Sequence, residues 1–352
     1  MRPFHSFVVT RRLGVAALAL VATSGTVLAG LSQSSITPPG GFMQACAGPS
    51  TNGASFWPGS DYSLNYTAPG SVVQELAFAG NTSVTQSAAY SSGNISNSAT
   101  GTCGLGYINA VASNSAPDMS SFPAGAADGG WKETFVIDAP GLTGQPGHMQ
   151  FTVDVAGSFF ASGLTGSAGF VVTIYKDNQL VQINPLFDPG DSNIIGTSVQ
   201  YGNWGVATYG NPPTESKIIA DTATFAVPIT FGTPFTLAVC ARATAGMRSS
   251  GGFDGISTAQ VDFSEGLTWG GISGVYLGLA PIQEYTVTGS SGVDWSGPVA
   301  SPLSPDLNGD GVVNGADLGI MLGAWGTSGG DLNGDGTTDG GDLGLLLGAW
   351  TG

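Results

Sequence analysis

The 352-residue sequence has few charged side chains, and basic ones are the scarcest. Eight Lys and Arg stand against 24 Asp and Glu, which gives a formal net charge of −16 at pH 7. A surface with this balance repels nucleic acids and anionic membranes. We therefore expect no nucleic-acid partner.

Histidine is nearly absent, and only His148 lies beyond the first 29 residues. No nucleophile-elbow or H-E-x-x-H signature accompanies it, so the sequence predicts no Ser-His-Asp hydrolase and no zinc protease. Glycoside cleavage needs only two carboxylates and stays open. The carboxylates show no pairing in the sequence, and we name none of them as catalytic: Glu75, Glu133, Asp154, Glu215, Asp262, Glu265 and Glu284.

Cysteine is also rare, with Cys46, Cys103 and Cys240 and no C-x-x-C pair, so a thiolate zinc site is not expected. In an exported protein a disulfide between Cys46 and Cys103 is reasonable, since both lie in the first third of the chain. Cys240 falls in an alternating segment, which favours a small buried thiol. Three cysteines do not determine a pairing.

No stretch of 18 consecutive apolar residues is present. Residues 1–29 contain three arginines, an apolar stretch over 13–22 and small residues at a usual cleavage spacing, which is typical of a secretory signal peptide. A membrane anchor is the alternative interpretation. After cleavage the chain would have no membrane span and would be secreted, extracellular or in the cell envelope, with a net charge of −19.

Residues 30–295 are rich in Gly, Ser, Thr, Ala and Val and poor in the charged residues that cover surface helices. Apolar and polar residues alternate over 149–155, 235–241 and 259–263, which predicts strands with one buried face. Further strands are expected at 72–78, 132–137, 170–175, 180–184, 222–229 and 284–288. Many short strands and turns predict a mainly β body, an antiparallel jelly-roll-like sandwich.

Turn signals include Asp128 to Gly130, and residues 50–101 have few large apolar side chains, which favours long loops there. Three prolines within 296–305 predict an extended linker. Aromatic residues in expected loops could stack on sugars or could pack in the core. They are Trp57, Tyr62, Tyr66, Tyr201, Trp204 and Tyr209.

The most informative segment is 306–352, where one calcium-loop pattern occurs twice, 25 residues apart. Oxygen-bearing side chains occupy positions 1, 3, 5, 9 and 12 of each copy, with Gly at position 6 for the sharp turn that a loop around Ca²⁺ requires. The first copy offers Asp306, Asn308, Asp310, Asn314 and Asp317, with the backbone carbonyl of Val312 at position 7. The second offers Asp331, Asn333, Asp335, Asp339 and Asp342, with the carbonyl of Thr337. We therefore predict two calcium ions.

Each loop is followed by apolar residues at offsets of 0, 3, 4 and 7, which places four side chains on one helix face. They are Leu318, Met321, Leu322 and Trp325, then Leu343, Leu346, Leu347 and Trp350. Helices this short are not stable alone in water. We expect the two stripes to pack against each other around the tryptophans, with folding coupled to metal binding.

A loop followed by one helix, repeated in tandem with Asp at position 12, resembles the type I dockerin domain. The resemblance covers only 306–352, and it implies calcium-dependent binding to a cohesin-like or other envelope partner. Members of that family commonly carry hydroxyl residues at positions 10 and 11 that help to select the cohesin. This chain has Gly315, Ala316, Gly340 and Gly341 there. The body over 235–295 loosely resembles secreted bacterial β-sandwich domains of unassigned function.

Three functions are consistent with these features. The first is a secreted, non-catalytic β-sandwich module, with polysaccharide as a candidate ligand, attached to its partner by the dockerin-like tail. The alternative is a polysaccharide-acting hydrolase or lyase with the same tail, because dockerins often accompany such enzymes. A purely structural envelope protein is the third.

Overall fold

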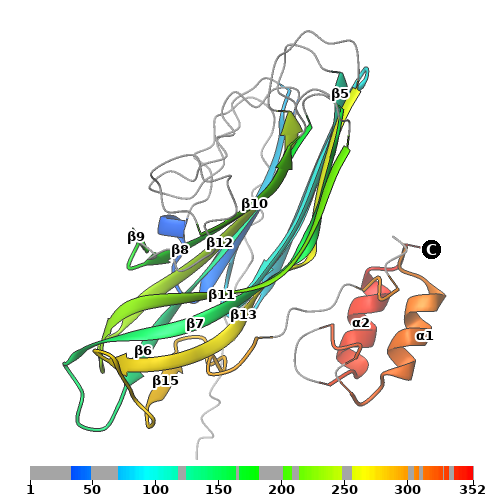
Figure 1. The fold of residues 1–352 in the computed structure, drawn as a ribbon. Helices are drawn as coiled ribbons and strands as arrows, with labels where there is room; N and C mark the ends of the chain where they lie inside the picture. The colour runs from blue at the N-terminus through cyan, green and yellow to red at the C-terminus, as the bar shows by residue number, and fades with distance from the viewer. Residues whose placement is uncertain are drawn as a thin grey trace, which may run out of the picture.

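The computed structural model describes residues 33–48, 70–117, 124–163, 166–181, 201–207, 214–247, 256–299, 305–308, 312–327, 329–332 and 337–351. The predicted signal peptide lies outside these ranges. Figure 1 shows a body of long strands followed by a pair of short helices near the C-terminus. The expectation of a mainly β protein with a small helical tail is confirmed at this level.

The body consists of two antiparallel sheets. In sheet A the strands run in the order β10-β8-β12-β6-β1-β2, with β15 paired to β6 and β9 to β8. Sheet A contains β1 (Gly40–Gly48), β2 (Val72–Ala79), β6 (Ala124–Asp138), β8 (Gly166–Lys176), β9 (Gln179–Leu180), β10 (Tyr201–Ala207), β12 (Phe235–Met247) and β15 (Thr286–Gly289). A short 3-10 helix, η1 (Gln33–Ser35), precedes it.

Sheet B has the order β11-β7-β13-β5-β4-β3, with β14 paired to β13. It contains β3 (Ser83–Ser92), β4 (Ile95–Gly104), β5 (Tyr107–Pro117), β7 (Pro146–Ser162), β11 (Thr214–Thr230), β13 (Ile256–Leu277) and β14 (Ala280–Pro281). The helices are α1 (Gly315–Gly323) and α2 (Gly340–Gly348).

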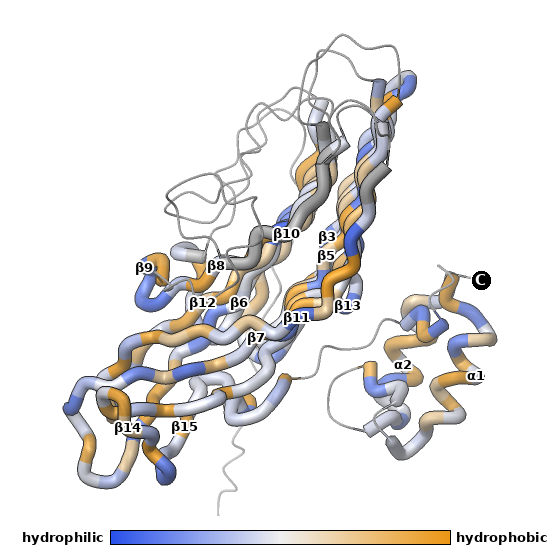
Figure 2. Tube along the Cα trace, viewed as in Figure 1, coloured by the Kyte–Doolittle hydropathy of each residue, from blue (hydrophilic) through white to orange (hydrophobic). Residues whose placement is uncertain are grey.

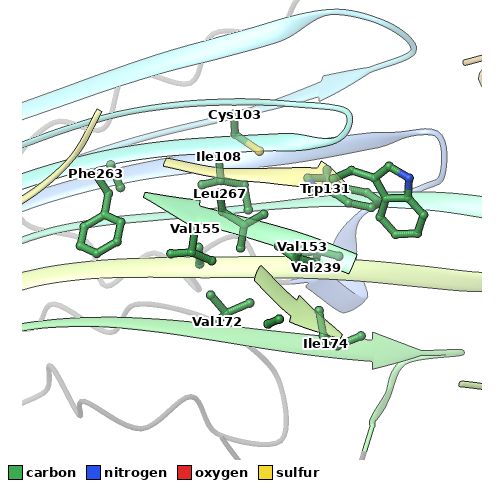
Figure 3. Close-up of a cluster of buried hydrophobic side chains, with 14 of the residues drawn as sticks. Cys103, Ile108, Trp131, Val153, Val155, Val172, Ile174, Val239, Phe263 and Leu267 are labelled. Carbon is green, nitrogen blue, oxygen red and sulfur yellow. The ribbon is translucent and has the colours of Figure 1, made fainter. Parts of the chain in front are cut away.

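The main hydrophobic core lies between the two sheets, because alternate residues of both sheets enter one buried cluster. Figure 3 shows part of it, with Val153 and Val155 of β7 near Val172 and Ile174 of β8. The period-two pattern over 149–155 correctly predicts which residues of β7 are buried. Figure 2 shows the same alternation as short bands of apolar and polar colour along the strands.

Two local predictions are wrong. The segment from Asp128 to Gly130 is the middle of β6 and pairs with both β1 and β12. Glycine suits this place because a Cβ on Gly130 would lie 2.6 Å from the Cys240 Sγ atom. Residues 50–101 are expected to include long loops, but 83–92 and 95–104 form the β3–β4 hairpin. Its buried side chains are small, such as Val84, Ala88 and Ala99, so the hydrophobic signal is weak.

Residues 290–295, which follow β15, are held against the body by hydrogen bonds to Glu133 and by the packing of Trp295. The Glu133 carboxylate is buried and accepts hydrogen bonds from the backbone N–H of Ser290 at 2.9 Å and of Ser291 at 3.2 Å. Trp295 is 1% exposed and stacks on Trp131, with ring centroids 5.1 Å apart. Because these groups fill the core, the segment stabilises the body.

Replacing Trp295 with alanine should therefore lower the free energy of unfolding of the body by about 3–5 kcal/mol, the usual cost of removing a buried Trp side chain. Urea unfolding of the protein measures this change. Leu279→Ala is the control, because the Leu279 side chain is 96% exposed and its loss should change stability by about 0.5 kcal/mol or less. Equal stability of the two variants would show that Trp295 does not hold this segment.

The cysteines are three separate buried thiols, so the expected Cys46–Cys103 disulfide is absent. Cys103 lies in the core between the sheets, whereas Cys46 lies with Ala126 in a separate cluster. The neighbours of Cys46, Ala45 and Ala47, face the core, so the Cys46 side chain points to the opposite face of sheet A. The expectation that Cys240 is a buried thiol is confirmed. Burial raises the pKa of all three thiols, which keeps them protonated and unreactive.

Thiol titration of the folded mature protein with a chromogenic disulfide reagent should therefore give no rapid reaction. The same titration in denaturant should give three equivalents, one for each cysteine. Recovery of one equivalent after unfolding would reveal a disulfide and contradict this arrangement.

Candidate functional site

The two C-terminal helices share a small core that is distinct from the core of the body. Val313, Met321, Leu332 and Leu346 are its buried members. Met321 and Leu346 are 25 residues apart, and they occupy the same place in the two copies of the repeat. Thus the sequence repeat is also a structural repeat, in which each copy supplies one loop and one helix.

In the first copy, Asp317 at position 12 turns its carboxylate back towards the start of the loop. Its Oδ1 atom accepts hydrogen bonds from the backbone N–H of Leu307 at 2.8 Å and of Asn308 at 3.2 Å. Its Oδ2 atom accepts from the N–H of Asn314 at 2.8 Å. The hydrogen bond from Asn314 is the main cause that lowers the pKa of Asp317, so the carboxylate stays charged.

The second copy repeats this geometry. Asp342 Oδ1 accepts from the N–H of Leu332 at 2.7 Å, and Oδ2 accepts from the N–H of Asp339 at 2.7 Å. Asp317 and Asp342 are both fully buried. In each copy the residue at position 12 therefore brings the two ends of the loop together.

The residues at position 9 begin the helices. The side chain of Asn314 accepts from the N–H of Ala316 at 2.7 Å, and that of Asp339 accepts from the N–H of Gly341 at 2.7 Å. Both helices have a capping box, in which the Asp three residues later bonds back to the N-cap. Loop closure and helix initiation thus depend on the same carboxylate.

The other predicted ligands are placed as follows. Asp331 is buried, Asp306 is half-buried, and Asn308, Val312 and Thr337 are exposed. Asp310, Asn333 and Asp335 lie outside the described residues, as do the two turn glycines. Among the described residues, three or more acidic, Cys or His side chains do not gather closely enough to form a metal cluster.

The packing expected around the tryptophans is wrong. Trp325 is 48% exposed and Trp350 is 40% exposed, while the buried contact between the helices is made by Met321 and Leu346. Two nine-residue helices can bury only a narrow stripe of each apolar face. Six apolar side chains are left in solvent: Ile320, Leu322, Trp325, Leu345, Leu347 and Trp350. Leu322, Trp325, Leu347 and Trp350 belong to the predicted stripes, and we call these four residues the helix face. Ile320 and Leu345 lie on the other side of their helices.

The body holds a buried ionic row that the sequence does not reveal. On the outer side of sheet A, Arg242 donates to Asp128 at 2.8 Å, and their side chains are 3% and 0% exposed. Gln44 pairs with Asp128 in the next strand and donates to Glu75 at 3.0 Å. Each carboxylate already has a partner within the row, which favours a structural role over acid–base catalysis.

The remaining carboxylate candidates are scattered. Glu133 binds the segment after β13, and Asp154 accepts a hydrogen bond from Thr222. Asp262 caps a bulge in β13, where it accepts from the N–H of Ser264. Glu265 and Glu284 are exposed, and the side chain of Glu215 lies outside the described residues. These placements do not suggest a pair that would flank a glycosidic bond.

The outer face of sheet B carries rows of hydroxyl groups. One row crosses five neighbouring strands through Ser91, Ser96, Ser115, Thr258 and Ser162. Hydroxyl pairs connect strands at 2.8 Å (Thr85 with Thr102), 3.0 Å (Thr100 with Ser87), 2.8 Å (Ser98 with Ser113) and 2.5 Å (Ser162 with Thr258). Adjacent rows are separated by about 7 Å along a strand, so the face has a regular polar pattern.

The predicted aromatic sugar platform stays untested. Trp57, Tyr62, Tyr66 and Tyr209 lie outside the described residues, and the side chains of Tyr201 and Trp204 in β10 lie outside them as well. His148 stacks on Tyr276 with ring centroids 4.8 Å apart, which supports a structural role for this histidine.

No protein-family model matches the chain, and no curated protein is significantly similar to it. Among the described residues, no helix is long and apolar enough to span a membrane.

Proposed function

We propose that this is a secreted β-sandwich protein whose C-terminal repeat is a calcium-dependent, dockerin-like docking module. The observation that carries the proposal is the duplicated geometry of Asp317 and Asp342, each of which closes a loop and caps a helix. A disordered acidic tail has no reason to repeat these contacts at a 25-residue interval.

The donor chemistry of the loops fits calcium. Every predicted ligand is a carboxylate, amide or carbonyl oxygen, the donors that this hard cation prefers. Residues Asp306 to Asp317 would hold one ion, and Asp331 to Asp342 the second. Bound calcium would offset the charge of the clustered carboxylates and make loop closure more favourable.

The helix face is the proposed docking surface. Its tryptophans and leucines are exposed at equivalent positions of both copies, and buried Trp residues commonly dominate binding energy at interfaces. The helices carry only Gly and Ala at positions 10 and 11, so the partner would be recognised chiefly by apolar contact. A cohesin-like module of an envelope or scaffold protein is the partner that this surface is proposed to bind.

Binding of the mature protein to a panel of purified cohesin modules tests this function. We expect capture of at least one module in 1 mM calcium. This concentration is at the upper end of the dissociation constants of extracellular calcium modules, which are about 0.1–1 mM. Capture should be lost in excess chelator and with Trp325→Ala plus Trp350→Ala. If the protein binds none of the modules, or if it binds them equally well with and without calcium, the docking function is contradicted.

The hydroxyl rows of sheet B favour a second role for the body, binding of a neutral polysaccharide. A surface rich in hydroxyls can exchange hydrogen bonds with a polyhydroxylated chain, and the outer face of β3, β4 and β5 supplies it on a molecule that is otherwise strongly acidic. This binding role is independent of the calcium module.

We also propose a jelly-roll-like topology for the body, since the strands alternate between the sheets from β5 to β8 and from β10 to β13.

Depletion assays with insoluble cellulose, chitin and xylan test the second role. Thr100→Glu together with Thr85→Glu should abolish any retention, because both side chains are exposed on the hydroxyl face. Thr288→Glu, on β15 of the other sheet, is the matched control. Retention that the hydroxyl-face variant leaves unchanged would exclude this face as the binding surface.

A further inference from the structure

The two loops of the C-terminal module do not stand alone, because each is hydrogen-bonded to the chain that follows the opposite helix. Position 8 of the first loop is Val313, and position 8 of the second is Thr338. Val313 accepts from the N–H of Thr351 at 3.0 Å, and Thr338 accepts from the N–H of Gly326 at 3.0 Å. Gly326 and Thr351 are themselves 25 residues apart, so the two contacts are equivalent by the repeat.

Both contacts are completed by a second hydrogen bond in the reverse direction. The N–H of Val313 donates to the Thr351 Oγ1 atom at 2.9 Å. The N–H of Thr338 donates to the carbonyl of Thr327 at 2.6 Å. Each loop is thus fixed at position 8 by two bonds, which we call the cross-clamps.

Position 8 lies between two predicted calcium ligands, the carbonyl at position 7 and the side chain at position 9. A cross-clamp therefore restrains the ligands on both sides of it. Val313 and Thr338 are also buried, at 9% and 0% exposure, so a loop cannot shift there without disturbing the shared core. The clamp residues that follow each helix are in turn positioned by that helix, which begins at position 9 of its own loop.

We propose that the cross-clamps couple the two calcium loops, so that filling one raises the affinity of the other, with Thr351 as the positioning residue for the first loop. This inference rests on the proposed calcium function. An ion in the second loop orders α2, and α2 carries Thr351 to Val313 in the first loop. Because coupling between two sites is reciprocal, an ion in the first loop has the same effect on the second.

Titration calorimetry of calcium into the full mature protein measures the coupling. Asp335→Ala disables the second loop without removing the capping box of α2. The affinity of the first loop should then fall by roughly 5- to 150-fold relative to its affinity when both loops are intact, the usual range for coupled sites. Thr351→Val, which keeps the side-chain shape but removes the Oγ1 acceptor, should shrink that difference.

Thr288→Val in the body is the control for the exchange of a hydroxyl for a methyl group. The outcomes separate the two proposals. Binding of no calcium by the wild-type protein would overturn the calcium function itself. Two ions that bind independently, or a coupling that Thr351→Val leaves unchanged, would overturn the cross-clamp proposal while the calcium function stands.

Discussion

Replacing Asp317 with alanine is expected to reduce the number of calcium ions bound by the protein from two to one. The Asp317 carboxylate is the predicted twelfth-position ligand, and it also accepts three backbone hydrogen bonds that close the loop. Loss of the capping box should in addition destabilise α1 by about 0.5–2 kcal/mol. Calorimetric stoichiometry and far-UV circular dichroism measure the two effects.

Asp342→Ala is the matched variant, because Asp342 has the equivalent position in the second copy. Each single variant should retain one ion, and the double variant should bind none. Asp294→Ala, an exposed carboxylate before the linker, should retain both. Two ions bound by the double variant would show that position 12 is not a ligand.

Replacing Arg242 with methionine should lower the free energy of unfolding of the body by about 3–5 kcal/mol. The change leaves the Asp128 carboxylate fully buried with its ionic partner removed. Adding Asp128→Leu should recover most of this loss, since a buried ion pair and an apolar pair of similar volume are often close in stability. Urea unfolding of the single and double variants measures the difference.

The partly exposed pair of Lys176 and Asp177 provides the control for this experiment. Its side chains are 22% and 49% exposed, so Lys176→Met should cost about 0–1 kcal/mol. If Arg242→Met were equally mild, the Asp128 carboxylate would have another source of compensation. If the double variant were no better than the single one, the loss would come from packing.

The sequence predicts strands well where one face is buried in a core of large side chains. Residues 149–155 fall inside β7 because they alternate Met, Phe and Val with polar residues. Residues 235–241 fall inside β12 with Phe235, Leu237 and Val239 in the core, although Ala238 and Cys240 on the other side are buried as well. The β3–β4 hairpin is not predicted because the buried apolar residues of its core face are small, namely Val84, Ala88, Ala99 and Cys103, while Ser and Thr predominate on the other face. Small apolar residues give little hydrophobic contrast.

The prediction also fails where a sheet is buried on both faces. Asp128 to Gly130 resembles a turn, yet Gly130 accommodates the Phe42 and Cys240 side chains on the outer side of sheet A, and Gly129 accommodates Met43 and Ile108 on the core side. Asp128 is kept in a buried strand by Arg242, which is 114 residues away in the chain. A partner at that separation cannot be identified from local pattern.

In the tail, the spacing of the repeat predicts both helices, but it does not predict the capping boxes formed by Asn314 with Asp317 and by Asp339 with Asp342. It does not predict which apolar residues are buried, because four side chains at helical spacing cover a wider arc than one short neighbouring helix can shield. Met321 and Leu346 take the central contact, and the tryptophans remain exposed. That outcome leaves apolar side chains of both copies in solvent.

The most direct test of the central claim is calcium titration of the calcium-free mature protein by calorimetry, with circular dichroism recorded before and after. Two bound ions and a gain of helical signal are expected, and Asp317→Ala and Asp342→Ala should each halve both. No heat of binding at millimolar calcium, with an unchanged spectrum, would contradict the claim that residues 306–352 form a calcium-dependent module.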